Sequence, residues 1–390
     1  MEKLWEGSRA IAETIKMCRP KVISAYPITP QTHIVENLSQ LVVDGDLIAE
    51  FINVESEHSA ASVVLGASAT GARTYTATTS QGLLLMLEVL YNIAGMRLPV
   101  VMTCANRSVS APLSIWNDQQ DSFTARDSGW IQLYAEDSQE ACDLHLMAYR
   151  IAEDKRIMLP VMVCLDGFFI SHTFEPVEPF EEKNVKQFLP DYQPPYYLTP
   201  KNPLTFGSFA EPDKYTEARY SIHRTLEESK MVIRETAEDF KKVFGRGGKG
   251  LVEGYLLKDA NFAFVAMGSI IGSLKDLVDK LREEGEKVGI LKIISFRPFP
   301  GEEIAMALKG IEKIAVLEKA VSLGSGGILV KEVKESFYGR NKTPQISGFI
   351  LGLGGRDIPQ DSLENIYREF HQGSGDASFI DLNYELLGGK

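Results

Sequence analysis

The sequence has no long apolar stretch, no excess of positive charge and few cysteines. No segment approaches the roughly 20 consecutive apolar residues that span a bilayer, and the amino terminus, MEKLWEGSRA, lacks the apolar core of a signal peptide. The chain carries 41 basic and 53 acidic residues and has a net charge of −12, whereas broad binding to nucleic acid or anionic membranes requires a basic surface. We therefore expect a cytoplasmic protein with no membrane span and no nucleic-acid partner.

Metal chemistry is also restricted, because the chain has only 4 cysteines and 6 histidines. Cys18, Cys104, Cys142 and Cys164 are too far apart for a CxxC motif, which argues against a zinc or iron–sulfur site of local spacing. Cys104 and Cys164 stand within apolar runs, where a buried thiol serves as a small hydrophobic side chain. No two histidines are four residues apart. We predict no metal site on this chain.

The amino-terminal part of the chain alternates between strand-like and helix-like segments. Strands are predicted over 22–28, 47–54, 73–79, 98–104 and 159–165. Helices are predicted over 57–70, 81–95 and 138–153, in addition to two earlier ones around Ile11–Cys18 and Ile34–Leu41. Nearly continuous apolar strands separated by helices are typical of a parallel sheet that is covered on both faces. The pattern predicts a first α/β domain over residues 1–173.

Residues 174–203 interrupt this alternation with seven prolines, a content that we take to exclude a helix or a central strand. Aromatic side chains in the same segment favour an extended arm that crosses a surface or a partner. A long helix is predicted over 213–244, and the glycine-rich stretch 245–250 is predicted to be a linker. Residues 174–256 are therefore assigned as an arm, a helix and a linker.

From residue 257 the alternation resumes and predicts a second parallel-sheet domain over 257–390. Its predicted strands are 262–267, 288–294, 313–318 and 345–351, and its predicted helices are 271–284, 301–309 and one that follows Gly324–Gly327. The loop Gly324–Gly327 lacks the downstream acidic residue of a dinucleotide fold, so phosphate binding there is disfavoured. GLGGRD at 352–357 suits either a domain interface or an anion site, and we favour the interface.

Two polar residues follow predicted strands, at the place where ligands bind in open α/β sheets. Thr29 ends the first strand within YPITP, where the neighbouring prolines restrict its orientation. A helix cap is an equally good interpretation of Thr29. Arg107 follows the fourth strand and has the two-pronged donor geometry that grips a carboxylate or phosphate, although an isolated arginine in a loop is more often solvated. A polar loop over 118–121 follows it.

A third candidate is Glu57, near the start of a helix rich in small residues. Acidic residues at a helix start often do no more than interact with the helix dipole. Glu57 nevertheless begins a face of alanine and glycine that permits close approach by a backbone or a flat ligand. This composition favours a buried, functional carboxylate.

These segments together resemble one known family. The matching blocks are YPITPQT at 26–32, ESEHSA at 55–60, TATTSQGL at 76–83, NRSVSAPLSIWNDQQD at 106–121, RDSGW at 126–130, RPFP at 297–300 and GLGGRD at 352–357. In this order they resemble the α subunit of pyruvate:ferredoxin oxidoreductases, which belong to the thiamine-diphosphate-dependent 2-oxoacid:ferredoxin oxidoreductases. The resemblance implies a pyrimidine-binding domain of the thiamine-diphosphate fold, followed by a transketolase C-terminal-like domain.

The resemblance also implies an activity, the oxidative decarboxylation of pyruvate with coenzyme A to acetyl-CoA and CO₂, with electrons passing to ferredoxin. Glu57 matches the family glutamate that hydrogen-bonds N1′ of the aminopyrimidine and so favours the imino tautomer that removes the thiazolium C2 proton. Thr29 and Arg107 match residues that contact the substrate. Glu57, Thr29 and Arg107 are thus the implied catalytic set, with Glu57 binding the cofactor.

Two parts of a complete enzyme of this family are missing from the sequence. One is the GDG-type motif with a downstream asparagine that holds Mg²⁺ and the diphosphate, and the other is any ferredoxin-like cysteine cluster. The resemblance therefore implies a β-type subunit with the diphosphate half and a cluster, and γ- and δ-type subunits with [4Fe–4S] clusters.

Two alternatives remain from the sequence. Branched 2-oxoacid enzymes share much of the pattern, so 2-oxoisovalerate is the competing substrate. The other alternative is a non-catalytic scaffold subunit, in which Glu57 caps a helix and Arg107 is solvated.

Overall fold

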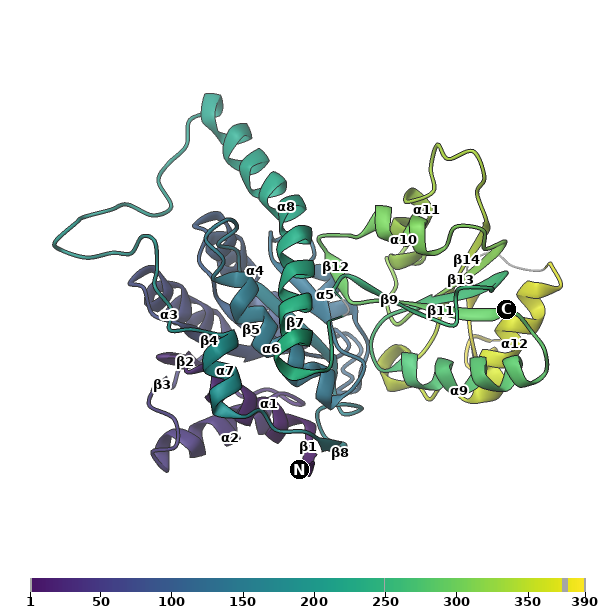
Figure 1. Cartoon of the computed structure of the whole chain (residues 1–390), viewed down its shortest axis with the longest axis horizontal. Helices are drawn as coiled ribbons and strands as arrows, with labels where there is room; N and C mark the ends of the chain where they lie inside the picture. Colours follow the sequence, from purple (N-terminus) through teal and green to yellow (C-terminus); the bar gives the residue numbers. More distant parts are fainter. Residues whose placement is uncertain (1, 249, 374–377, 389–390) are drawn as a thin grey trace.

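The computed structural model describes residues 2–248, 250–373 and 378–388, and within them most strands belong to two large sheets flanked by helices (Figure 1). The first sheet has seven strands in the order β12-β6-β7-β5-β4-β2-β3. Its strands are β2 (Val22–Ser24), β3 (Glu50–Ile52), β4 (Thr74–Thr78), β5 (Val101–Asn106), β6 (Ile131–Tyr134), β7 (Val161–Asp166) and β12 (Ser295–Arg297). Among the described residues, no helix combines the length and apolar character needed to cross a bilayer.

The first sheet confirms the predicted parallel α/β arrangement. Its neighbours from β6 to β3 all pair in parallel, and β12 alone runs antiparallel to β6. Strands β4, β5 and β7 are buried along their whole length, as expected for strands covered on both faces. The helices of this part are α1 (Gly7–Cys18), α2 (Thr32–Val43), α3 (Glu57–Ala69), α4 (Ser80–Gly95), α5 (Gln120–Thr124) and α6 (Ser138–Ala152).

The predicted exclusion of a helix from residues 174–203 is wrong. Helix α7 (Glu182–Phe188) fits in the proline-free interval between Pro179 and Pro190. Its buried Phe188 packs against Phe240 of α8 (Pro212–Phe244), with ring centroids 5.4 Å apart. Strand β8 (Phe174–Val177) and β1 (Lys3–Glu6) form a two-stranded sheet. Pro176 is therefore not in a central strand, where its missing N–H would cost a hydrogen bond between strands. The rest of the segment loops away from the body before α8, drawn in teal in Figure 1.

The second sheet has six strands in the order β15-β14-β13-β10-β11-β9. Its strands are β9 (Val252–Tyr255), β10 (Phe262–Ala266), β11 (Val288–Ile293), β13 (Lys313–Glu318), β14 (Gln345–Ile350) and β15 (Ser378–Phe379). Its helices are α9 (Ile270–Glu283), α10 (Gly301–Ala307), α11 (Leu329–Glu335) and α12 (Gln360–His371), with a short 3₁₀ turn, η1 (Leu353–Gly355). Strand β9 precedes residue 257, and the predicted linker includes Lys249, which lies outside the described residues.

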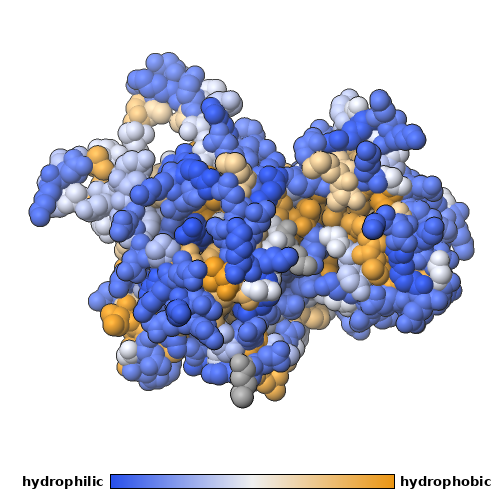
Figure 2. Space-filling model, viewed as in Figure 1, coloured by the Kyte–Doolittle hydropathy of each residue, from blue (hydrophilic) through white to orange (hydrophobic). Residues whose placement is uncertain are grey.

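The two sheet units share a continuous hydrophobic core, which joins residues such as Met102 of β5 to residues such as Val265 of β10. Phe296 on β12 packs edge-on against Phe123 of α5, with ring centroids 4.5 Å apart, and both rings are fully buried. Burying a side chain of this size contributes about 1.5–3 kcal/mol to stability. In Figure 2 hydrophobic residues, in orange, gather between the two lobes of a mainly hydrophilic face. All four cysteines are buried and free, which confirms the interpretation of Cys104 and Cys164.

Candidate functional site

The predicted site residues leave the same edge of the first sheet. Strand β4 pairs in parallel with β2 and with β5, and β2 pairs in parallel with β3. Their carboxyl ends therefore meet at one edge, from which the loops to Thr29, Glu57 and Arg107 depart. This is the edge where ligands bind in open α/β sheets.

Arg107 and Thr29 are in direct contact. Arg107 is 6% exposed, its Nη1 donates to the backbone oxygen of Thr29 at 2.8 Å, and its Nε donates to the oxygen of Ser114 at 3.1 Å. Within the described residues its Nη2 has no hydrogen-bond partner. Burial lowers the pKa of Arg107 and the Asp121 carboxylate opposes the shift, but a guanidinium stays charged at neutral pH. Arg107 is thus a buried cation, which excludes the interpretation as a solvated loop residue.

Asp121 anchors the loops that follow β4 and β5. Its Oδ2 accepts hydrogen bonds from the backbone N–H of Ser80 at 2.8 Å and of Arg107 at 3.0 Å. Its Oδ1 accepts from Asn106 Nδ2 at 2.7 Å. Burial raises the pKa of Asp121, and these donors oppose the shift. From the sequence, Asp121 was expected only to lie in a polar loop. Its anchoring role could not be predicted, because its donors Ser80 and Arg107 come from different segments of the chain that meet only in the folded sheet.

The loop that carries Thr29 is clamped while Thr29 itself is exposed. The buried Gln31 accepts from the N–H of Ile28 at 3.2 Å and donates from Nε2 to the oxygen of Ala77 on β4 at 2.7 Å. Helix α2 begins at Thr32, so Gln31 and not Thr29 holds the cap position. The helix-cap interpretation of Thr29 is therefore wrong, and its hydroxyl is available to a ligand.

Glu57 is the first residue of α3 and is 7% exposed. Its helix is capped by Ser56, whose Oγ accepts from the N–H of Ser59 at 3.2 Å, so Glu57 does not serve as the cap. In the part of the chain that the structure describes, the Glu57 carboxylate has no hydrogen-bond partner. Its two oxygen atoms are not among the fully buried atoms that lack a partner, so they keep some contact with solvent. The carboxylate therefore makes no competing hydrogen bond and can be reached by a ligand.

Gly82 on α4 lies tightly packed against this carboxylate. A Cβ atom built on Gly82 would lie 2.7 Å from Glu57 Oε1 and 2.5 Å from Thr78 Oγ1. The Thr78 hydroxyl is buried and has no hydrogen-bond partner among the described residues. A glycine at position 82 therefore allows the Glu57 carboxylate and the Thr78 hydroxyl to lie close to the backbone of α4, where a larger side chain would displace them.

A buried ion pair joins the site edge to the second sheet unit. Asp166, at the end of β7, accepts from Lys319 Nζ at 2.8 Å and from Ser269 Oγ at 2.5 Å. Burial would raise the pKa of Asp166, but the Lys319 ammonium and these hydrogen bonds hold it below its ordinary value. The N–H of Gly354 donates to Asp118 Oδ2 at 3.2 Å, so GLGGRD forms an interface turn as favoured from the sequence.

A cleft of about 710 Å³ opens between the two units on this side. Trp116 and Phe168, with ring centroids 4.6 Å apart, line it from the first unit, and Arg356 lines it from the second. Gly167, which precedes the cleft-lining Phe168, packs against the Thr29 loop, because a Cβ on Gly167 would lie 2.5 Å from Cγ of Pro30.

Two family models match the chain. The model described as pyruvate flavodoxin/ferredoxin oxidoreductase, thiamine diphosphate-binding, matches residues 13–238. The model described as pyruvate:ferredoxin oxidoreductase core domain II matches residues 260–363. The first match contains all three predicted site residues.

Curated relatives match over nearly the whole chain. The pyruvate synthase subunit PorA of Methanosarcina barkeri is 52% identical over 389 residues, covering 98% of this chain and 97% of the relative. The pyruvate synthase subunit PorA of Methanothermobacter thermautotrophicus is 48% identical, and the match covers 98% of this chain and 99% of the relative. The ketoisovalerate oxidoreductase subunit VorA of Pyrococcus horikoshii is 44% identical, and the match covers 92% of this chain and 91% of the relative.

A solved structure has the same fold. The 2-oxoglutarate:ferredoxin oxidoreductase from Magnetococcus marinus superposes with a TM-score of 0.69 at 19% sequence identity. The match covers 94% of this chain and 65% of the longer chain. At this identity the likeness is one of fold, and it agrees with the two parallel-sheet units.

Proposed function

This chain belongs to the pyruvate:ferredoxin oxidoreductase family, and we propose that Glu57, Thr29 and Arg107 are its contribution to an active site completed by partner subunits. Its activity is that of an α-type subunit, in a complex that oxidatively decarboxylates pyruvate with coenzyme A and transfers electrons to ferredoxin. The cofactor of this reaction is thiamine diphosphate. The observation that carries the proposal is the buried Glu57 side chain at the ligand-binding edge of the sheet, whose carboxylate has no hydrogen-bond partner among the described residues.

Glu57 is proposed to bind the aminopyrimidine ring. Thiamine diphosphate, when bound, supplies a thiazolium carbon that reacts as a nucleophile and accepts electrons from the substrate. The Glu57 carboxyl would share a proton with ring atom N1′ through a hydrogen bond. The buried Thr78 hydroxyl, which has no hydrogen-bond partner among the described residues, supports a polar ligand near this place.

Arg107 and Thr29 are proposed to hold the substrate. The Nη2 of Arg107 is free to donate to the carboxylate of a 2-oxoacid, while its other nitrogen atoms are fixed by Thr29 and Ser114. A guanidinium restrained in this way orients the substrate without losing much conformational entropy on binding. The exposed Thr29 hydroxyl lies on the loop that Arg107 holds and can donate to the keto oxygen.

The remaining parts of the enzyme are proposed to lie on other subunits. A β-type subunit would supply the diphosphate half of the cofactor site with Mg²⁺ and a cluster, and γ- and δ-type subunits would carry further [4Fe–4S] clusters toward ferredoxin. The complex would act in the cytoplasm. Within this chain, we propose a pyrimidine-binding domain over 1–173, a connecting segment over 174–256 and a transketolase C-terminal-like domain over 257–390.

The competing substrate is 2-oxoisovalerate, because relatives named for ketoisovalerate are 44% identical. Identity to the pyruvate synthase subunits is higher, at 52% and 48%, and favours pyruvate. Assaying the assembled complex with pyruvate, 2-oxobutyrate and 2-oxoisovalerate tests this choice. A higher kcat/KM for 2-oxoisovalerate would overturn the assignment to pyruvate.

The role of Glu57 is tested by Glu57→Gln in the reconstituted complex, with pyruvate-dependent viologen reduction as the readout. Loss of general acid–base assistance is expected to lower the rate by about 10²–10⁴-fold. The matched control is Glu55→Gln, since Glu55 lies two residues away, is exposed and bonds only to Ser59 and its own backbone. Full activity of Glu57→Gln would exclude the proposal and favour the scaffold alternative.

A further inference from the structure

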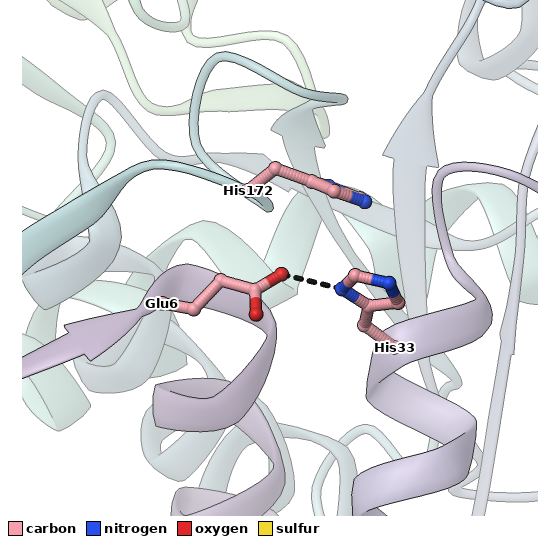
Figure 3. A group of neighbouring side chains, drawn as sticks. All are labelled: Glu6, His33 and His172. Atoms are coloured by element: carbon pink, nitrogen blue, oxygen red, sulfur yellow. Dashed lines mark hydrogen bonds and ion pairs between the residues drawn. The ribbon is translucent and has the colours of Figure 1, made fainter.

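We propose that Glu6, His33 and His172 form a binding site for a divalent first-row transition-metal ion, with Zn²⁺ as the type ion. One potential ligand atom from each of these residues lies within 4.8 Å of the other two. Figure 3 shows the three side chains converging on one space. Across the described residues, no other set of three histidine, cysteine or acidic side chains meets this distance criterion.

Three different elements deliver these side chains. Glu6 ends β1 and directly precedes α1, His33 lies in the first turn of α2, and His172 lies in the loop between β7 and β8. The Glu6 carboxylate contacts His33 Nδ1 at 2.6 Å, and the rings of His33 and His172 have centroids 4.5 Å apart. The Glu6 side chain makes no capping hydrogen bond to α1, so helix capping does not compete with metal binding for this carboxylate.

Backbone hydrogen bonds fix two of the three residues relative to each other. Strand pairing places Glu6 opposite Phe174. The N–H of Gly7 donates to the oxygen of Thr173 at 3.1 Å, and the N–H of Ser8 donates to the oxygen of Ser171 at 2.8 Å. Glu6 and His172 are therefore held close before any ion binds, which lowers the entropic cost of assembling the site.

His172 also has the outer-shell contacts typical of a metal ligand. Its Nδ1 lies 2.8 Å from Ser171 Oγ, and its ring packs at a tilt against Phe168, with ring centroids 4.8 Å apart. When Nδ1–H donates to this hydroxyl, Nε2 carries the lone pair that coordinates an ion. The two contacts restrain the orientation of the ring.

The donor set selects the kind of ion. Two imidazoles and one carboxylate suit Zn²⁺, Co²⁺ or Ni²⁺, whereas Mg²⁺ and Ca²⁺ prefer oxygen ligands throughout. Metal–ligand bonds of about 2.0–2.2 Å require the donor atoms to approach more closely than 4.8 Å. The His33 side chain is 46% exposed, so it is free to make that movement and to leave a coordination position for water.

A bound ion would cross-link α2 to the loop between β7 and β8. These segments flank the place where Pro30 contacts Gly167, so the ion would stabilise the surroundings of the Thr29 loop. Binding to the folded state alone raises thermal stability with ion concentration. An increase of the unfolding temperature with Co²⁺ or Zn²⁺ is therefore expected to accompany binding.

The test titrates the untagged, chelator-treated full chain with Co²⁺ and follows its visible absorption, with Zn²⁺ competition and calorimetry as second readouts. One equivalent is expected to saturate the wild type. His33→Ala, His172→Ala and Glu6→Gln are each expected to weaken binding by at least about 10-fold. The matched control His223→Ala, an exposed histidine on α8, is expected to bind like the wild type.

Circular dichroism shows whether each variant is folded. The exposed position of His33 makes His33→Ala the variant expected to keep the wild-type spectrum. Absence of saturable one-to-one binding by the wild type would overturn the proposal. Folded His33→Ala with wild-type affinity would overturn it equally. Neither result bears on Glu57, so this site and the proposed function fail independently.

Discussion

The Nη1 of Arg107 donates a 2.8 Å hydrogen bond to the backbone oxygen of Thr29, which joins the loops that follow β5 and β2. Strand β4 separates these two strands in the sheet, so the hydrogen bond bridges over its carboxyl end. The bond ties the Arg107 guanidinium to the loop that carries Thr29. The substrate contacts proposed for both residues are therefore expected to depend on this hydrogen bond.

Arg107→Ala is expected to lower kcat/KM for pyruvate roughly 30- to 1,000-fold, because it removes a buried charged donor. This corresponds to a loss of about 2–4 kcal/mol of transition-state stabilisation. Steady-state kinetics of the reconstituted complex measure this loss. Arg224→Ala on α8 is the control, because Arg224 is exposed and pairs with Glu228 one turn away. Unchanged constants for Arg107→Ala would remove this residue from the site.

Gly82→Ala is expected to abolish most of the activity while the protein stays folded. The added methyl group would come within 2.7 Å of Glu57 Oε1 and 2.5 Å of Thr78 Oγ1, so it would displace the carboxylate from the position in which it is proposed to bind the ring. Gly95→Ala is the matched control, since Gly95 lies on the same helix and its Cβ would meet nothing within 4 Å. Activity and cofactor affinity are measured together, and equal values for both variants would contradict the assignment.

Lys319→Met is expected to destabilise the protein by about 3–5 kcal/mol, because it leaves the buried Asp166 carboxylate without its counter-ion. Lys280→Met is the control, since the Lys280 side chain is 54% exposed in its pair with Glu364, and such a pair contributes at most about 1 kcal/mol. Urea unfolding monitored by fluorescence gives the midpoints. Equal shifts for the two variants would show that the Asp166–Lys319 pair is not structural.

Asp118→Asn is expected to stabilise the protein more at pH 8 than at pH 5. Burial raises the pKa of Asp118 to about 7, well above the value of about 3.9 for an unfolded chain. The folded state therefore binds the proton more tightly, and Asp118 makes stability fall as the pH rises from about 4 to 7. Thermal unfolding at the two pH values measures the difference, with the exposed Asp127→Asn as control. A pH-independent difference between Asp118→Asn and wild type would contradict this expectation.

The sequence was sufficient for the fold class, and it supplied Thr29, Glu57 and Arg107 as the proposed site residues. Apolar strands such as β5 and β7 are buried along their whole length, so their composition alone predicts central parallel strands. Thr29, Glu57 and Arg107 follow the predicted strands 22–28, 47–54 and 98–104, and parallel strands place such residues at one edge. Strand β6 was not predicted, because its four residues are too few to show a period.

Long-range contacts could not be predicted from local pattern. The role of Asp121 depends on hydrogen bonds from Ser80 and Arg107, which approach only when β4 and β5 pair. The expectation of no metal site rested on local spacing, whereas Glu6 and His33 lie 27 residues apart. The count of prolines in 174–203 obscured α7, because the position of each proline matters more than their number.

The central claim is that the Glu57 carboxyl controls proton removal from the bound thiamine ring. The most direct measurement is the rate of deuterium exchange at thiazolium C2 of thiamine diphosphate in the reconstituted complex, followed by NMR after rapid quenching. Glu57→Gln is expected to slow this exchange by about 10²-fold or more, while Glu55→Gln leaves it unchanged. Equal exchange rates in the wild type and in Glu57→Gln would contradict the account.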